Sequence, residues 1–105
     1  MPEILKKDSF ENFINQPFAI VDFWASWCGP CRALMPILEK ISLEKGIKIG
    51  KMSVEDEETE AFAQRYHVQS IPTLLFFKNG ELVDTNVGLI SEDDLLEKIK
   101  QHAAQ

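Results

Sequence analysis

The sequence predicts a layered α/β domain whose sheet contains both parallel and antiparallel strands. Three observations favour this fold class: a length of 105 residues with 45% hydrophobic residues, alternating strand-like and helix-like segments, and one strong hairpin signal at Asn79-Gly80. This length and composition suit one globular domain with an ordinary core. We therefore expect residues 1–105 to form a single domain.

The chain opens with an expected strand and a short helix. Residues 2–5 suit an edge strand, because a proline such as Pro2 is tolerated only at an edge or an end of a sheet. Asp8 is a candidate N-cap residue with Glu11 three positions later, a pattern that predicts the start of a helix. We expect that helix to end by Pro17.

The next two segments lie on either side of Cys28. Residues 18–24 are almost continuously apolar, as in a central strand buried on both faces, and Asp22 is out of place there. In residues 31–43 apolar side chains recur at helical spacing, and Gly46 follows as a stop signal.

The rest of the chain predicts a strand, a helix and a hairpin. Residues 47–54 alternate as a strand does, and an acidic approach precedes an expected helix at residues 59–66. Residues 73–77 and 82–87 flank Asn79-Gly80, so these two strands should pair antiparallel.

A final helix should follow a cap at residues 91–94. The complete order is strand, helix, strand, helix, strand, helix, hairpin, helix, which implies parallel crossovers and one antiparallel section. In such sheets the chemistry tends to lie beyond the carboxyl ends of the strands, and Cys28 falls at that position.

Composition argues against several classes of partner. The net charge is -6 and the basic residues are scattered, so the electrostatic footprint for nucleic acid or anionic lipid is missing. The apolar runs are strand-sized and residues 1–3 do not resemble a signal peptide, so we expect neither a membrane span nor a secretory leader. With only two cysteines, a reducing cytoplasm is the expected compartment.

The two cysteines, in the stretch Trp27-Cys28-Gly29-Pro30-Cys31, have three possible uses. A structural bridge across so short a loop would stabilise the fold by only about 2 kcal/mol. A structural zinc site needs four ligands, and the remaining candidates, His67 and His102, are not a ligand-spaced pair. A reactive thiol pair is therefore favoured.

Each residue of the motif suits a reactive pair. A helix N-terminus at Cys28 would stabilise its thiolate, which makes Cys28 the nucleophile. Cys31 lies one helical turn further and is the candidate resolving thiol. Pro30 fits the first turn of a helix, and Gly29 permits a tight corner between strand and helix.

These residues resemble the thioredoxin family. The family signature Trp-Cys-Gly-Pro-Cys stands at Trp27 to Cys31 and follows Val-Asp-Phe-Trp-Ala at residues 21–25. The similarity covers residues 4–99 and continues through further landmarks: Pro36, Lys51, Ile71-Pro72-Thr73, Lys78-Asn79-Gly80 and Val87-Gly88.

The resemblance implies a thioredoxin fold, with a central five-stranded mixed sheet flanked by four helices. It also implies a protein-disulfide reductase that needs no bound cofactor. Its redox-active Cys28-Cys31 disulfide would accept electrons from a thioredoxin reductase, with NADPH as the expected donor, and pass them to client proteins. A monomer is expected, because the apolar surface around the site would be reserved for transient clients.

The resemblance also assigns roles to other residues. Asp22 would be a buried carboxylate that exchanges a proton with Cys31, and burial should raise its pKa. Lys51 would lie beside that carboxylate, although a lone lysine on a strand is usually only solvated. Pro72 would be a cis-proline, although sequence alone favours a trans bond. The implied substrate-binding residues are Trp27, Gly29, Pro30, Ile71, Pro72, Val87 and Gly88.

Two other functions use the same scaffold. A disulfide oxidant or isomerase is one, although a histidine in place of Pro30 would favour it and proline favours reduction. A redox-silent binding subunit is the other, and a metal centre shared by two chains is a weaker option. Ser53, Glu58 and His67 depart from the family pattern, and we interpret His67 as a helix-capping residue and the acidic run 55–60 as a solvated helix approach.

Overall fold

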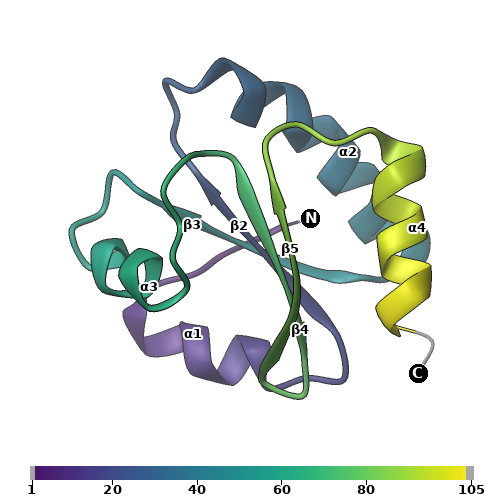
Figure 1. Cartoon of the computed structure of the whole chain (residues 1–105), viewed down its shortest axis with the longest axis horizontal. Helices are drawn as coiled ribbons and strands as arrows, with labels where there is room; N and C mark the ends of the chain where they lie inside the picture. The colour runs from purple at the N-terminus through teal and green to yellow at the C-terminus, as the bar shows by residue number, and fades with distance from the viewer. Residues whose placement is uncertain (1, 104–105) are drawn as a thin grey trace.

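The computed structural model describes residues 2–103 and contains a five-stranded mixed sheet between two pairs of helices (Figure 1), which confirms the expected fold class. The elements in chain order are β1 (Glu3–Ile4), α1 (Lys7–Ile14), β2 (Ala19–Trp24), α2 (Gly29–Lys45), β3 (Lys48–Ser53), α3 (Thr59–Arg65), β4 (Thr73–Lys78), β5 (Glu81–Val87) and α4 (Glu92–Ala103). No helix among these residues is long and apolar enough to cross a membrane.

The strands lie in the order β1-β3-β2-β4-β5, with β2 in the middle. β1 and β2 both pair parallel with β3, and β4 pairs antiparallel with β2 and β5. The expected edge position of the N-terminal strand and the expected hairpin are therefore confirmed. Asn79 and Gly80 both have positive φ, 52° and 87°, as the tight hairpin turn requires.

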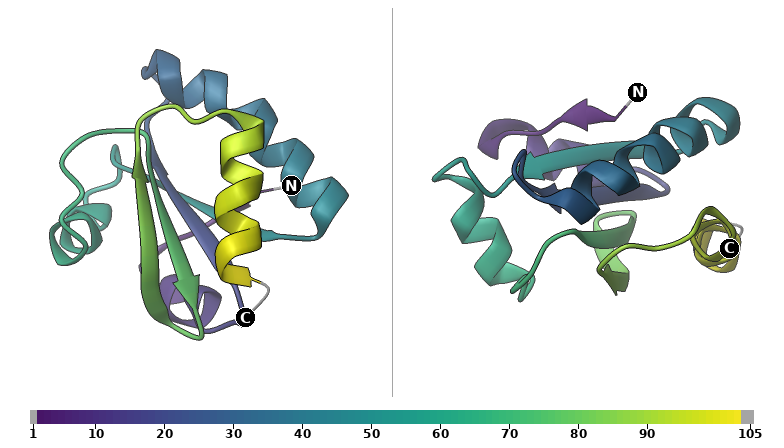
Figure 2. Two further views of the ribbon diagram at one scale, coloured as in Figure 1. Left: turned by 45° about the vertical axis from the view of Figure 1, so that its right-hand side comes forward. Right: turned by 90° about the horizontal axis from the view of Figure 1, so that it is seen from above.

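Each face of the sheet is covered by one pair of helices (Figure 2). Side chains of β2 alternate between the two faces, so neighbouring residues contribute to different cores. Val21 and Phe23 pack with α1 and α3, whereas Ile20 packs with α2 and α4. Because both faces of β2 are covered, the strand is apolar at almost every position.

Helix ends follow the predicted signals in three places. Gly46 ends α2 in the left-handed conformation, at φ 63°. His67 follows α3 at φ 58°, and the N–H groups of His67 and Val68 donate to carbonyls of the last helical turn at 3.3 and 2.8 Å. This pattern is a Schellman motif, so His67 is a capping residue as interpreted. At the start of α4, Ser91 Oγ accepts a hydrogen bond from the N–H of Asp94 at 3.1 Å.

The predicted cap of the first helix was wrong. α1 begins at Lys7, one residue before the expected cap Asp8, and Lys6 is the N-cap residue. The hydroxyl of Ser9 accepts a hydrogen bond from the N–H of Lys6 at 3.0 Å. The N–H of Lys7 donates to the carboxylate of Glu58 at 3.1 Å. A carboxylate distant in sequence therefore replaces the local cap that the pattern predicted.

Gly50 of β3 should not tolerate a side chain. A Cβ built there would lie 2.5 Å from Leu5 Cδ1 and 3.0 Å from Phe13 Cε2, both in the core under α1. We expect Gly50→Ala to lower the free energy of unfolding by about 1–3 kcal/mol, because a tight core must shift. Urea denaturation measures this change. In the control Gly29→Ala the new Cβ meets nothing within 4 Å, so an equal loss in both variants would contradict the steric explanation.

Candidate active site

The two cysteines lie where the loop after β2 leads into α2. Cys28 is the N-cap residue of α2 and forms a disulfide with Cys31, with their Cα atoms 5.2 Å apart. The N–H of Cys31 donates to Cys28 Sγ at 3.2 Å, and the N–H of Arg32 donates to the carbonyl of Cys28 at 3.1 Å. Pro30 stands in the first helical turn, as the sequence predicted.

The two sulfurs have different surroundings. Cys28 is 6% exposed and Cys31 is fully buried, so a partner molecule reaches Cys28 first. In the reduced state the N–H of Cys31 and the positive end of the helix dipole would stabilise a thiolate at Cys28. The geometry therefore suits an attacking thiol at Cys28 and a second thiol at Cys31 that is protected from solvent.

Asp22 is buried in the middle of β2. Its side chain is fully inaccessible, and neither carboxylate oxygen has a hydrogen-bond partner in the described part of the chain. Asp22 points to the same face as Ile20, which packs against α2, the helix that carries Cys31. Burial raises the pKa of Asp22 from 3.8 to about 7, although the charge of Lys51 opposes this increase.

Lys51 lies on β3 directly beside Asp22 in the parallel register. Side chains of paired residues point to the same face of a sheet, so Lys51 also faces α2. Its Nζ lies 4.6 Å from the centre of the Trp24 ring, within the range of a cation–π interaction. The structure thus places Lys51 next to the carboxylate, where its charge partly offsets the burial of Asp22.

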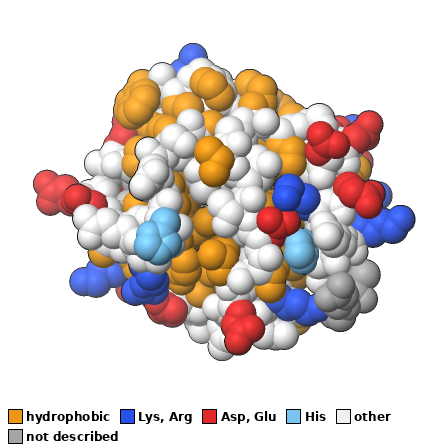
Figure 3. Space-filling model, viewed as in Figure 1, with side chains coloured by type: hydrophobic (Ala, Val, Ile, Leu, Met, Phe, Trp, Pro, Cys, Tyr) orange, Lys and Arg blue, Asp and Glu red, His pale blue; other side chains and the backbone are white. Residues whose placement is uncertain are grey.

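Apolar residues lie next to Cys28, because Trp24, Val54 and Ile71 pack against the cluster that contains both cysteines. Trp27, which directly precedes Cys28, is 68% exposed, and Val87 is 65% exposed. The Ile71–Pro72 peptide bond is cis, as the resemblance implied, and the N–H of Gly88 donates to the carbonyl of Pro72 at 2.8 Å. Figure 3 shows hydrophobic side chains gathered along the upper edge of this view, above the carboxyl end of β2.

Not all expected substrate-binding residues are equally accessible. Gly29 and Pro30 are exposed and Ile71 is partly exposed, whereas Pro72 is buried. Beside this apolar surface lies a groove of about 510 Å³, lined on its apolar side by Trp27, Val54, Ala63, Val68 and Ile71. The groove runs from the active-site loop to α3 and offers room for a segment of another protein.

The acidic run is mostly exposed, as expected for a solvated helix approach, but some of its residues also form specific contacts. Glu55 accepts two hydrogen bonds from Ser26, from its N–H and from its Oγ, each at 2.9 Å. Asp56 pairs with Lys6 at 2.7 Å. The sequence carried no signal for the first contact, because its partners are 29 positions apart and on different loops.

The described residues contain no group of three or more His, Cys, Asp or Glu side chains that could hold a metal ion. The groups that the structure brings together at this site are the thiol pair, a carboxylate with a raised pKa and exposed apolar side chains.

Comparisons with known proteins show what this chain is similar to. The sequence profile of the family described as Thioredoxin matches residues 1–101. The thioredoxin of Chlamydia caviae is 41% identical over 98% of this chain and 100% of its own length, and that of Bacillus subtilis is 39% identical over 90% of each. A solved mutant thioredoxin from Halobacterium salinarum NRC-1 superposes with a TM-score of 0.89 at 32% identity, covering 97% of this chain and 90% of that one.

Asp22 should make stability depend on pH. The folded chain keeps this proton up to about pH 7, whereas the unfolded chain loses it near 3.8, so the free energy of unfolding falls as pH rises between these values. The loss is on the order of 4 kcal/mol above pH 7. We expect Asp22→Asn to remove this loss, so the variant should be the more stable protein at pH 8.5 but not at pH 4.5.

Urea denaturation of the oxidised proteins at both pH values measures this difference. The matched control is Glu97→Gln, which replaces an exposed carboxylate of α4. A difference between wild type and Asp22→Asn that stays constant from pH 4.5 to 8.5 would show that burial does not raise this pKa.

Proposed function

The chain belongs to the thioredoxin family of thiol-disulfide oxidoreductases, and we propose that Cys28 and Cys31 reduce disulfides in client proteins with electrons from a thioredoxin reductase. The observation that carries this proposal is the unequal exposure of two bonded cysteines at a helix N-terminus. One sulfur is accessible to a partner and the other is held behind it.

The first step is an attack by Cys28. Its thiolate, stabilised at the start of α2, attacks one sulfur of the client disulfide. A mixed disulfide forms between Cys28 and the client, and the other client sulfur leaves as a thiolate that takes up a proton. Trp27, Val87 and the backbone around Ile71 contact the client here, the last by strand-like pairing.

The second step releases the client. Cys31 transfers its proton to Asp22, whose raised pKa allows it to accept a proton near neutral pH. The Cys31 thiolate then attacks Cys28 Sγ, which closes the Cys28–Cys31 disulfide and expels the second client sulfur as a thiolate. This thiolate takes the proton from Asp22 and so restores the carboxylate, whereas the first client thiolate took its proton from solvent. In total two electrons pass from the protein to the client, with one proton from Cys31 and one from solvent.

The oxidised protein must be reduced again before another turnover. The thioredoxin reductase would return two electrons from NADPH to the Cys28–Cys31 disulfide, so the protein itself needs no bound cofactor. We expect this cycle to operate in the cytoplasm, where client disulfides are the substrate and reduced thiols are the resting state.

The assignment of the two thiols predicts opposite results for two substitutions. Cys28→Ser should abolish insulin reduction, because the attacking thiol is lost. Cys31→Ser should form the mixed disulfide but release it slowly, so a covalent complex with the client should accumulate. Turnover with NADPH and a thioredoxin reductase, followed by non-reducing gel electrophoresis, measures both effects. A complex that accumulates with Cys28→Ser instead would reverse the assigned roles.

A further inference from the structure

All three polar groups of Ser26 form hydrogen bonds. Its N–H and Oγ each donate to the Glu55 carboxylate at 2.9 Å, and its carbonyl accepts a hydrogen bond from Arg32 Nη1 at 3.0 Å. Ser26 directly precedes Trp27 and stands two residues before Cys28. The connection between β2 and α2 is therefore tied to the connection between β3 and α3.

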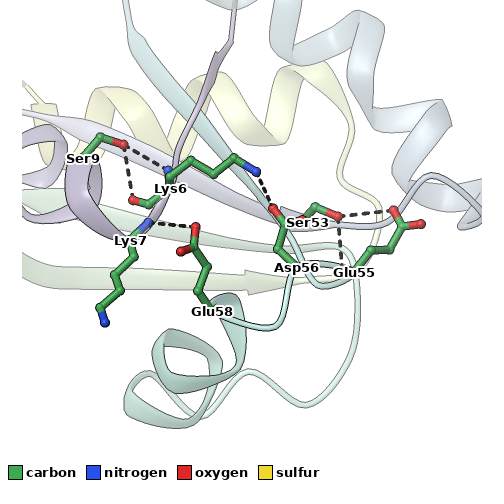
Figure 4. A network of polar contacts seen from close by, with 7 residues as sticks. All are labelled: Lys6, Lys7, Ser9, Ser53, Glu55, Asp56 and Glu58. Atoms are coloured by element: carbon green, nitrogen blue, oxygen red, sulfur yellow. Dashed lines mark hydrogen bonds and ion pairs between the residues drawn. The ribbon is translucent and has the colours of Figure 1, made fainter.

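Glu55 is itself fixed in place. Its N–H donates to Ser53 Oγ at 3.1 Å, and that hydroxyl donates to Glu55 Oε1 at 3.2 Å. Figure 4 shows that the same loop is joined to α1, through the Lys6–Asp56 ion pair and the hydrogen bond from the N–H of Lys7 to Glu58. The carboxylate that accepts hydrogen bonds from Ser26 thus belongs to a loop that also contacts the start of α1.

Hydrogen bonds from Ser26 also keep Glu55 ionised. The backbone N–H of Ser26, its hydroxyl and the hydroxyl of Ser53 lower the pKa of Glu55. The carboxylate therefore remains an acceptor throughout the neutral range. Hydrogen bonds to a charged group are in general stronger than neutral ones.

Trp27 and Cys28 depend on this contact to different degrees. Cys28 is held by α2 itself, through the N–H groups of Cys31 and Arg32, and by its own N–H to Ala25. Trp27 is largely exposed, so core packing does not fix its position. Its backbone is constrained on one side by the start of α2 and on the other by Ser26.

We propose that Glu55 is a positioning residue that holds the Trp27 side of the active-site loop in the orientation that client proteins bind. It acts through Ser26 and touches neither sulfur. This inference rests on the proposed function and adds one feature to it: loss of Glu55 weakens the recognition of protein clients but leaves the reactivity of Cys28 unchanged.

The test compares a protein client with a small reagent. In Glu55→Gln the side chain keeps its length, but its NH2 group cannot accept the second hydrogen bond from Ser26. Single-turnover mixing of the pre-reduced protein with excess oxidised insulin, without a reductase, separates the half-saturating insulin concentration from the maximal rate. Alkylation of Cys28 by iodoacetamide measures the reactivity of the thiolate alone.

We expect Glu55→Gln to raise the half-saturating insulin concentration roughly three- to tenfold, the range of one net hydrogen bond. The maximal rate and the alkylation rate should stay within about twofold of wild type. Ser26→Ala removes one of the two hydrogen bonds without a change in charge, so it should give a smaller increase in the same direction. The double variant should be no worse than Glu55→Gln alone.

Glu97→Gln is the matched control, because it makes the same chemical change at an exposed residue on α4. If Glu55→Gln and Glu97→Gln have the same half-saturating insulin concentration, the proposal is overturned. A change in alkylation rate that parallels the change in insulin reduction would also overturn it, because Glu55 would then act on the thiolate.

A readout that is independent of activity separates this inference from the proposed function. Hydrogen exchange of the Ser26 amide, followed by NMR, should be about tenfold faster in Glu55→Ala, which removes both acceptor oxygens, than in wild type. If wild type fails to reduce insulin but this amide is released only in Glu55→Ala, the proposed function fails and the loop contact stands. Equal exchange in both proteins would overturn the loop contact.

Discussion

The burial of β2 at the centre of the sheet is the constraint on which the rest of the structure depends. The strand pairs with β3 on one side and β4 on the other, and helices cover both of its faces. Its carboxyl end is therefore the point where the chain leaves the core. The turn into α2 then places Cys28 at a helix N-terminus and at the surface, while Cys31 stays one turn inside.

The same burial explains the chemistry of Asp22. A carboxylate in a central strand loses its hydration, and the described residues provide no hydrogen bond in exchange, so its neutral form is favoured near pH 7. Lys51, on the adjacent strand, limits this effect but does not cancel it. A strand composed only of apolar residues would stabilise the fold more, so Asp22 opposes stability in a position that faces α2, the helix that carries Cys31.

Local patterns in the sequence predicted most of the fold and the centre of the site. The apolar spacing of α2, the Asn79-Gly80 turn and the cysteine pair each depend on neighbours in sequence, which is why they could be recognised. Contacts between distant segments could not. The cap of α1 was misplaced because Glu58, fifty-one positions from Lys7, supplies the acceptor. The hydrogen bonds from Ser26 to Glu55 could not be predicted for the same reason.

Contacts of this kind explain two of the departures from the family pattern, Ser53 and Glu58. The hydroxyl of Ser53 donates a hydrogen bond to Glu55, which accepts hydrogen bonds from Ser26 in the active-site loop. Glu58 accepts a hydrogen bond from the first turn of α1. His67 occupies the left-handed position that ends α3. Ser53 and Glu58 therefore make contacts at the two ends of the segment that carries Glu55. Because each has a partner in the fold, neither departure is an isolated substitution on the surface.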